Sequence, residues 1–223
     1  MYKFKDSFFS NEYNRYLQTR NEGLKKQSNK ILEKLMLYFD ELDEGIKSEI
    51  CTEFCILRFE KDEIRDFNFF LHKRILAFLE SACVGNQMPH LRWHYQLTRD
   101  EEKLERAYKH IERDEKTIYL AFNCLLSSLF WGAHHLPSYC IIEESECDRL
   151  LGEAQKFIEI HAISERQKES YLYYKMLYDD WWAYQSGDFD YSFGEWCANQ
   201  NRDYGWVATY YFEGRSARKH NPL

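Results

Sequence analysis

Proline is absent from the first 88 residues of this 223-residue chain, which contains only three prolines in all. Because proline is the strongest helix breaker, long helices can form throughout this region. Apolar residues there recur at steps of three and four, as Ile64, Phe67, Leu71, Ile75 and Phe78 do in "DEIRDFNFFLHKRILAFLESA". This spacing is typical of an amphipathic α-helix and predicts one across that segment, closed by the Gly and Pro of "VGNQMPH".

Two capping boxes mark further helix starts. In such a box, the side chains of a Ser or Thr and of an acidic or amide residue three positions later each bond a backbone N–H. Thr98 with Glu101 predicts the start of one long helix reaching about residue 130, with a bend at "ERDEK" where the apolar stripe weakens. Ser164 with Gln167 predicts the start of a second, which "QSGDFD" ends. Other helices are expected at 11–39 (one or two), 45–59, 143–162, 192–199 and 202–212.

No stretch shows sustained alternation of apolar and polar residues, so no strand is expected. The predicted class is all-α: an irregular bundle of seven to nine helices, joined as antiparallel hairpins by short loops. A length of 223 residues suits a single domain over 1–223, with halves at 1–88 and 98–213 as the alternative division. Residues 214–223 are expected to form a frayed basic tail.

Composition indicates a folded protein in a reducing compartment. The chain is 44% hydrophobic and 30% charged, which argues against disorder. Its seven cysteines are odd in number and several lie among apolar neighbours, as free buried thiols do. The opening "MYKFKDSFFS" lacks the apolar segment of a signal peptide, and the most apolar stretch, 118–131, is too short to span a bilayer. We therefore expect a cytoplasmic protein with no membrane association.

Negative charge is concentrated in the C-terminal third. The formal net charge is −7, and residues 143–213 alone carry fifteen acids and six bases, a net of −9. The segment 178–212 within it contains thirteen aromatic residues and six acids but only one base. Large rings are efficient core residues, yet Tyr and Trp ringed by charge are also typical of protein interfaces. Both interpretations remain open from the sequence.

If this segment forms an interface, its acids favour a basic protein partner and disfavour nucleic acid, whose phosphates they would repel. The expected partner-binding residues are Asp179, Asp180, Tyr184, Asp188, Phe189, Asp190, Tyr191, Glu195, Asp203, Tyr204 and Trp206.

No metal or cofactor motif is complete. Histidines 90 and 94 share helical spacing, as do cysteines 51 and 55, and histidines 134 and 135 are adjacent, but none of these pairs has a matching third ligand. Glycine-rich phosphate loops and nucleophile elbows are absent as well. We therefore expect neither a metal site nor a bound cofactor.

The segment "RDFNFFLH" resembles the active-site motif of the helical HEPN-type ribonucleases. The resemblance implies that Arg65 and His72 would be catalytic in a paired dimer, with Asp66 at the polar position after the arginine. On a helix, Arg65, Asn68 and His72 would share one face. Histidine can serve as acid or base near neutral pH, and arginine can offset phosphate charge.

A second resemblance is to the bacterial all-α immunity proteins that neutralise nuclease toxins. "KDSFFSNEYNRYLQTRNEGL" is similar to their opening helix, and "YDDWWAYQSGDFDYSFGEWCANQN" looks like their Tyr- and Trp-rich closing segment. This resemblance implies a cytoplasmic protein that blocks a basic toxin. The leading hypothesis is thus a non-enzymatic immunity protein or antitoxin; the alternatives are a HEPN-like ribonuclease and a helical adaptor, and homodimerisation is left open.

Overall fold

The computed structural model describes residues 1–65 and 67–205, and these residues form helices without any strand. The all-α prediction is therefore confirmed for this part of the chain. It contains ten α-helices and one π-helical turn, slightly more than the seven to nine expected. The chain divides into two compact units, Met1–Arg113 and Asp114–Leu223, and each is described separately.

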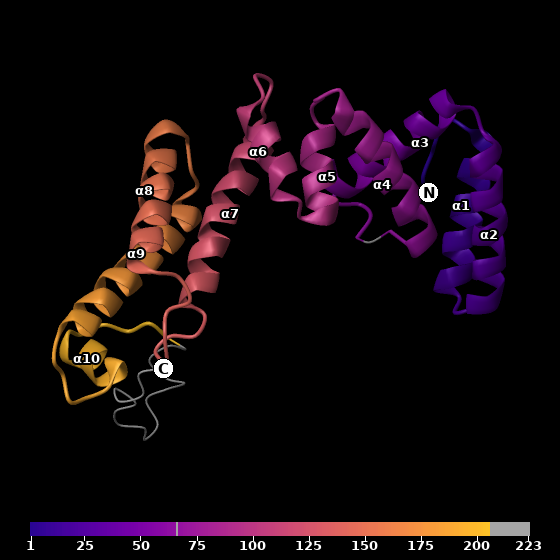
Figure 1. The fold of residues 1–223 in the computed structure, drawn as a ribbon. Helices are drawn as coiled ribbons and strands as arrows, with labels where there is room; N and C mark the ends of the chain where they lie inside the picture. Colours follow the sequence, from indigo (N-terminus) through magenta and orange to yellow (C-terminus); the bar gives the residue numbers. More distant parts are fainter. Residues whose placement is uncertain (66, 206–223) are drawn as a thin grey trace. The chain divides into compact units, whose positions relative to one another are not determined.

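The N-terminal unit is built around a core of aromatic and aliphatic residues, with Phe9 and Phe54 fully buried at its centre. α1 packs along α2, and α5 packs against both α4 and α6 (Figure 1). Its elements are α1 (Ser7–Asn21), α2 (Lys25–Glu41), α3 (Glu44–Cys55), the π-helical turn η1 (Ile56–Glu60), α4 (Phe69–Val84), α5 (His90–Thr98) and α6 (Glu101–Lys109).

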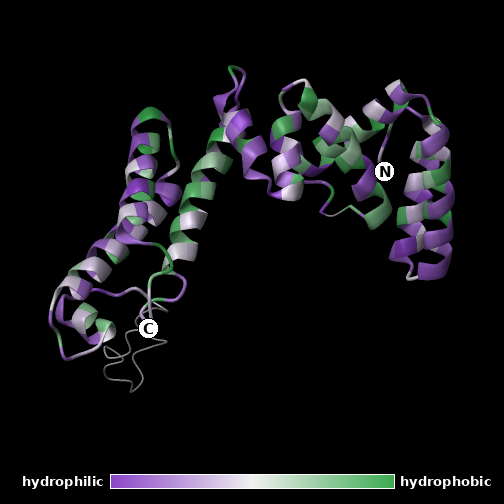
Figure 2. Cartoon of the chain, viewed as in Figure 1, coloured by the Kyte–Doolittle hydropathy of each residue, from purple (hydrophilic) through white to green (hydrophobic). Residues whose placement is uncertain are grey.

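In the C-terminal unit, α7 contacts both α8 and α9, while α10 packs on α9. Gln167 of α9 bonds Asn123 of α7 at 3.0 Å, and Tyr178 bonds the Leu129 carbonyl at 2.6 Å. Because both residue numbers rise together, α7 and α9 run in the same direction. Figure 2 shows α7 as largely apolar and α8 as mixed. The elements are α7 (Glu115–Ala133), α8 (Glu144–Ile160), α9 (Glu165–Ser186) and α10 (Phe193–Asn199).

Side-chain caps define most helix starts. A side-chain oxygen of the N-cap residue accepts from a backbone N–H of the first turn, which satisfies a donor that the helix leaves free. Ser164 caps α9 as predicted, whereas the other predicted box is wrong, because Thr98 ends α5 and Asp100 caps α6. The capping residues are Asp6, Asp43, Asn68, Asp100, Asp114, Ser164 and Ser192.

The long helix expected from residue 98 to about 130 is two helices. α6 ends at Lys109 and α7 begins at Glu115, so the break falls at the predicted bend, and the division between the two units lies there too. Asp114 starts α7 by accepting from the backbone N–H and the hydroxyl of Thr117, at 2.8 and 2.6 Å. The Asp114 cap thus starts a new helix at a point where the sequence pattern alone predicted that one helix would continue.

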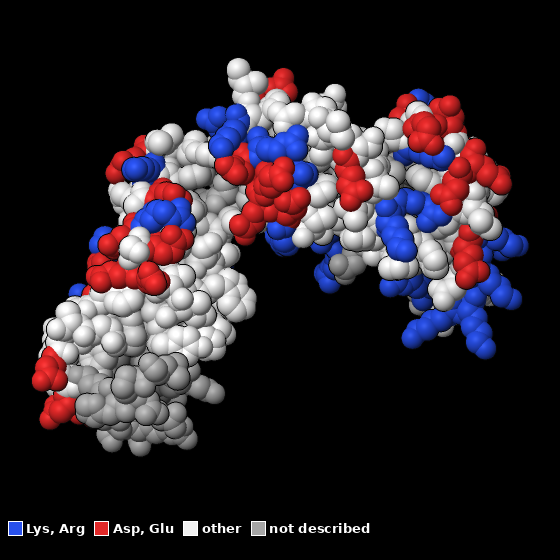
Figure 3. All heavy atoms as spheres, viewed as in Figure 1, with Lys and Arg blue, Asp and Glu red and all other residues white. Residues whose placement is uncertain are grey.

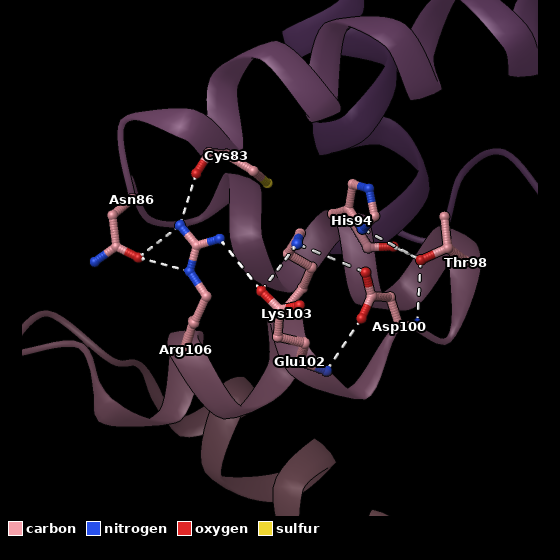
Figure 4. A network of polar contacts seen from close by, with 8 residues as sticks. All are labelled: Cys83, Asn86, His94, Thr98, Asp100, Glu102, Lys103 and Arg106. Carbon is pink, nitrogen blue, oxygen red and sulfur yellow. Dashed lines mark hydrogen bonds and ion pairs between the residues drawn. The ribbon is translucent and has the colours of Figure 1, made fainter.

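A polar network ties α6 to the end of α4 and fixes the α5–α6 turn (Figure 4). Arg106 donates to the Cys83 carbonyl at 2.8 Å and to the Asn86 side chain at 3.0 and 3.1 Å. Thr98 donates to the His94 carbonyl at 2.8 Å and accepts from the Asp100 N–H at 3.2 Å. These contacts hold helix ends to one another, so we assign this network a structural role.

Among the described residues, no helix combines the length and apolar character that crossing a membrane requires. All seven cysteines are free thiols, and five of them are buried. No three His, Cys, Asp or Glu side chains in the described part of the chain lie close enough together to hold a metal ion.

Candidate protein-binding surface

The aromatic run of the C-terminal unit folds largely into a ring cluster, which we define as Trp181, Tyr184, Phe193, Trp196 and Tyr204. Phe193, only 2% exposed, is its centre. Its ring centroid lies 5.2 Å from that of Trp181, edge-on, and 5.4 Å from that of Tyr184. It also stacks on Trp196 at 6.0 Å and on Tyr204 at 6.5 Å. Burial of these rings holds α10 against the end of α9, which favours the core interpretation for this part of the run.

Two residues expected to contact a partner are therefore core residues instead. Tyr184 and Tyr204 are 6% and 2% exposed. The Tyr184 hydroxyl donates to the Tyr191 carbonyl at 2.9 Å, and the Tyr204 hydroxyl donates to the Asp180 carboxylate. Because ring and hydroxyl are both used internally, neither side chain is free to meet another protein. Their role is to position the chain between α9 and residue 205.

Asp180 is likewise a structural acid. Its side chain is 13% exposed, accepts from the Tyr204 hydroxyl and forms an ion pair with Arg202 at 3.2 Å. Burial, reinforced by the hydrogen bond to Asp180, raises the pKa of Tyr204, so the phenol stays protonated as a donor. Removing this carboxylate would leave a buried hydroxyl without its acceptor, which is costly.

The remaining acids of the segment are exposed, and we call Asp179, Asp188, Asp190, Glu195 and Asp203 the acidic rim. Lys175 pairs with Asp179 at 2.6 Å. The Glu195 carboxylate completes a capping box by accepting from the Ser192 N–H at 2.7 Å, and this bond lowers its pKa. Asp203 accepts from the Gly205 N–H at 2.8 Å. Figure 3 shows acidic groups at the edge of the C-terminal unit near α10.

Two expected contact rings alternate with these acids in the sequence. Phe189 and Tyr191 are both partly exposed on the connection from α9 to α10, and their ring centroids are 5.3 Å apart. Phe189 also stacks on the buried Tyr184 ring, with centroids 5.9 Å apart, so the α9–α10 connection is anchored to the ring cluster. Trp206 lies outside the described residues. Sequence reasoning could not separate these rings, because which ring faces inward depends on contacts between α9 and α10.

The expected ribonuclease residues do not share a helix. α4 begins at Phe69, and Asn68 is its N-cap, accepting from the Leu71 N–H at 2.9 Å. Arg65 therefore lies in the preceding loop, where it is exposed, while His72 is in the first turn of α4. The prediction that Arg65, Asn68 and His72 occupy one helix face is wrong for this reason. Asp66 lies outside the described residues.

His90, His94 and the two cysteines 51 and 55 pack in or against the interior, whereas His134 is partly exposed and His135 is exposed. Rings of Phe78 and Trp93 lie 5.6 and 5.4 Å from that of His90. Burial lowers the pKa of His90 and, with a smaller opposing effect of Asp100, that of His94. Burial also raises the pKa of the Cys51 thiol to about 12. Such thiols pack as small apolar groups.

Comparisons with known protein families, with curated proteins and with solved structures find no match to this chain. Its function therefore has to be argued from its own residues.

Proposed function

We propose that this chain is a non-enzymatic protein-binding protein whose C-terminal unit engages a basic protein through the acidic rim. The observation that supports it is the division of labour in residues 178–205. The ring cluster and Asp180 are used internally, whereas the five acids of the rim are exposed, and two of them, Asp188 and Asp190, flank the partly exposed Phe189 in the sequence. Exposed like charges repel one another and add little to stability, whereas they attract and orient an oppositely charged partner.

The partner we favour is a nuclease toxin, which makes the chain a bacterial, cytoplasmic immunity protein or antitoxin. A nuclease must itself be basic to hold nucleic acid, so its active-site surface complements an acidic rim. The sequence resemblance to immunity proteins supports this choice over a general adaptor. Phe189 and Tyr191 would supply the apolar contact, since interfaces combine aromatic anchors with a charged periphery.

The test is capture of partners by the tagged full-length chain at low salt. The wild type is compared with the triple variant Asp179→Lys, Asp188→Lys, Asp190→Lys, which leaves Asp180 intact. The matched control reverses three exposed acids elsewhere on the same unit: Asp148→Lys, Glu159→Lys and Glu169→Lys. We expect a single basic protein that the wild type and the control retain and the triple variant loses.

Kinetics with that purified partner then separate steering from general charge effects. Association should slow about tenfold or more in the triple variant at low salt, and the difference should shrink as salt rises. If control and triple variant associate equally fast, the rim is not the site. A captured protein that has no nuclease activity, or whose activity survives binding, would rule out the immunity role.

The HEPN-like ribonuclease has less support, because Arg65 lies outside α4 and the residues are not arranged as the motif requires. Its test is RNA cleavage by the purified chain, with His72→Ala as the inactivating variant. Cleavage lost in this variant would replace the binding proposal with the enzymatic one.

A further inference from the structure

The N-terminal unit contains a pocket of about 250 Å³ that the acidic rim does not involve. Three segments meet there: the N-terminal residues, the last three turns of α1 and the loop before α4. The lining residues are Tyr2, Tyr13, Tyr16, Leu17, Arg20, Glu63, Ile64, Arg65 and Asn68. Sites for drug-sized molecules are usually about 300–1,000 Å³, so this pocket suits one ring-sized group or a small anion.

Tyr13 is the most informative residue of the pocket. It is 4% exposed, and its ring packs edge-on to Phe54 with centroids 5.0 Å apart. Within residues 1–65 and 67–205, its hydroxyl has no hydrogen-bond partner. Burial, with smaller effects of Tyr16 and Tyr2, raises its pKa, so the hydroxyl remains a donor. The hydroxyl is not among the polar atoms that are both unpaired and closed off from solvent, so it is reached from the pocket, where an acceptor on a ligand can take its hydrogen.

Other donors converge on the same space. Arg20 donates to the Tyr16 hydroxyl oxygen at 3.2 Å, which leaves the Tyr16 hydrogen free to be donated. The Asn68 side-chain oxygen is used to cap α4, which leaves its NH₂ group as a donor. Arg65 is exposed, and like Arg20 it forms no ion pair in the described part of the chain. Among the described residues that line the site, two guanidinium groups, two phenols and one amide are thus available as donors, and Glu63 is the one acid.

The wall formed by Tyr2 is held in place before any ligand binds. Chain ends usually fray unless they are tied down. Here the Tyr2 N–H donates to Asn14 at 2.8 Å and the Asn14 NH₂ donates back to the Tyr2 carbonyl at 2.7 Å. The Tyr2 hydroxyl donates to the Glu63 carbonyl at 3.1 Å. The two hydrogen bonds between the Tyr2 backbone and the Asn14 side chain keep the Tyr2 ring of the pocket at a fixed position.

The surroundings of the pocket are basic. Residues 15–34 carry six bases and two acids. Figure 3 shows basic groups gathered where α1 joins α2, next to Arg20 in the sequence. A local excess of positive charge raises the concentration of anions near a site.

We propose that this pocket binds a small phosphate monoester whose organic part is about the size of one ring. A phosphate offers three oxygens to the donors, and arginine matches its geometry with paired N–H groups. The tyrosine rings would cover the flat organic part, while Glu63 accepts a hydroxyl or amine of the ligand. A carboxylate, with two oxygens, uses fewer of the donors and binds more weakly. This site belongs to the N-terminal unit, whereas the rim belongs to the C-terminal unit, and the proposal does not depend on the proposed toxin partner.

The test is calorimetric titration of the full-length chain with phenyl phosphate. We expect saturable binding, weaker binding of inorganic phosphate and of benzoate, and none of phenol. Arg65→Gln should weaken affinity about tenfold or more, because a charge-assisted bond to phosphate is lost. Tyr13→Phe removes only the hydroxyl, keeps the ring against Phe54, and should weaken affinity about threefold to tenfold.

Arg15→Gln is the matched control, since Arg15 is exposed on α1, pairs with Glu12 at 3.4 Å and does not line the pocket. It changes net charge as Arg65→Gln does and should alter affinity less than twofold. Circular dichroism verifies that each variant is folded. Absence of saturable binding up to about 10 mM, or equal losses in Arg15→Gln and Arg65→Gln, would overturn the proposal.

Discussion

The two units are both rich in aromatic residues, and in each several tyrosine hydroxyls donate to groups of their own unit, as Tyr2 and Tyr38 do to the Glu63 carbonyl and the Asp6 carboxylate. They differ in that the N-terminal unit also places a tyrosine ring against a pocket. In the C-terminal unit, the hydroxyls of Tyr178, Tyr184 and Tyr204 donate to the Leu129 carbonyl, the Tyr191 carbonyl and the Asp180 carboxylate. In the N-terminal unit, Tyr13 lines the pocket. Rings whose polar ends are paired internally close a core, whereas rings with free polar ends leave a place for a ligand.

Charge differs between the units in the same way. Residues 1–113 carry twenty bases and twenty acids, whereas residues 114–223 carry ten bases and seventeen acids. The neutral unit contains a local basic region beside its pocket, and the acidic unit carries its exposed acids around a closed ring cluster. The comparison suggests that one unit accepts a small anion and the other a basic protein surface.

Removing a central ring tests whether both clusters are core. Phe193→Ala and Phe54→Ala should each lower the free energy of unfolding by about 3–5 kcal/mol, because both rings are buried and a cavity would remain. Urea denaturation measures the loss. Ile160→Ala, at a side chain 70% exposed, is the control and should change stability by about 0.5 kcal/mol or less. A loss near 1 kcal/mol for Phe193→Ala alone would mean that the C-terminal rings are not a core.

Gly132 tests how tightly the C-terminal unit is closed. A Cβ at this position would meet the Tyr178 hydroxyl, and it would lie 2.6 Å from an Ile142 methyl carbon. Gly132→Ala should therefore destabilise by about 1–3 kcal/mol through overpacking. Gly152 on α8 has open space around it, so Gly152→Ala should instead stabilise by up to about 1 kcal/mol. Thermal unfolding of both variants checks the signs, and equal shifts would contradict the close approach of α7 and Tyr178.

Acid should weaken the N-terminal unit through α5. Burial lowers the pKa of His90 and His94, so the unfolded chain takes up protons on these residues more readily than the folded one. Their contribution to stability is present above the unfolded pKa of about 6.5 and is lost as pH falls below it. The free energy of unfolding, measured from about pH 7 to 5, should fall more steeply in the wild type than in the double variant His90→Gln with His94→Gln. Equal slopes would show that the fold does not shift the pKa of these two imidazoles.

The smallest effect is expected at the acidic rim. Asp188→Lys with Asp190→Lys should change the free energy of unfolding by about 0.5 kcal/mol or less, since both side chains are exposed. Asp180→Asn should cost more, because the carboxylate accepts from the buried Tyr204 hydroxyl. Urea titration compares the two. If the rim pair proved as costly as Asp180→Asn, the rim would be part of the fold and not a free binding surface.

Sequence reasoning recovered the helices where the pattern is local. The apolar period and the Ser164 cap were enough to predict α9, and "QSGDFD" correctly marked its end. The start of α4 was missed because apolar residues continue the helical period back to Ile64, whereas the Asn68 cap makes the helix begin at Phe69. An N-cap can start a helix later than the apolar spacing indicates, because the spacing carries no information on the free energy that the cap contributes.

The sites were less predictable because they depend on contacts between distant residues. Tyr184 and Tyr204 lie in the same acidic, aromatic run as Phe189 and Tyr191, yet the first two are buried, and this depends on the packing of α10 on α9. The pocket joins Tyr13 to Arg65 across more than fifty residues, so no local pattern marks it. Exposure of the rim acids was foreseeable, since unpaired carboxylates are rarely buried.

The buried thiols can report how often each unit opens locally, through the rate at which a reagent modifies them. Cys51 in the N-terminal unit and Cys147 and Cys197 in the C-terminal unit are at most 2% exposed, and burial raises the pKa of each to about 12. A thiol reagent attacks the thiolate, so it can react only while the surrounding helices separate. Mass spectrometry of each modified cysteine would therefore compare the rates of local opening of the two units, without any engineered label.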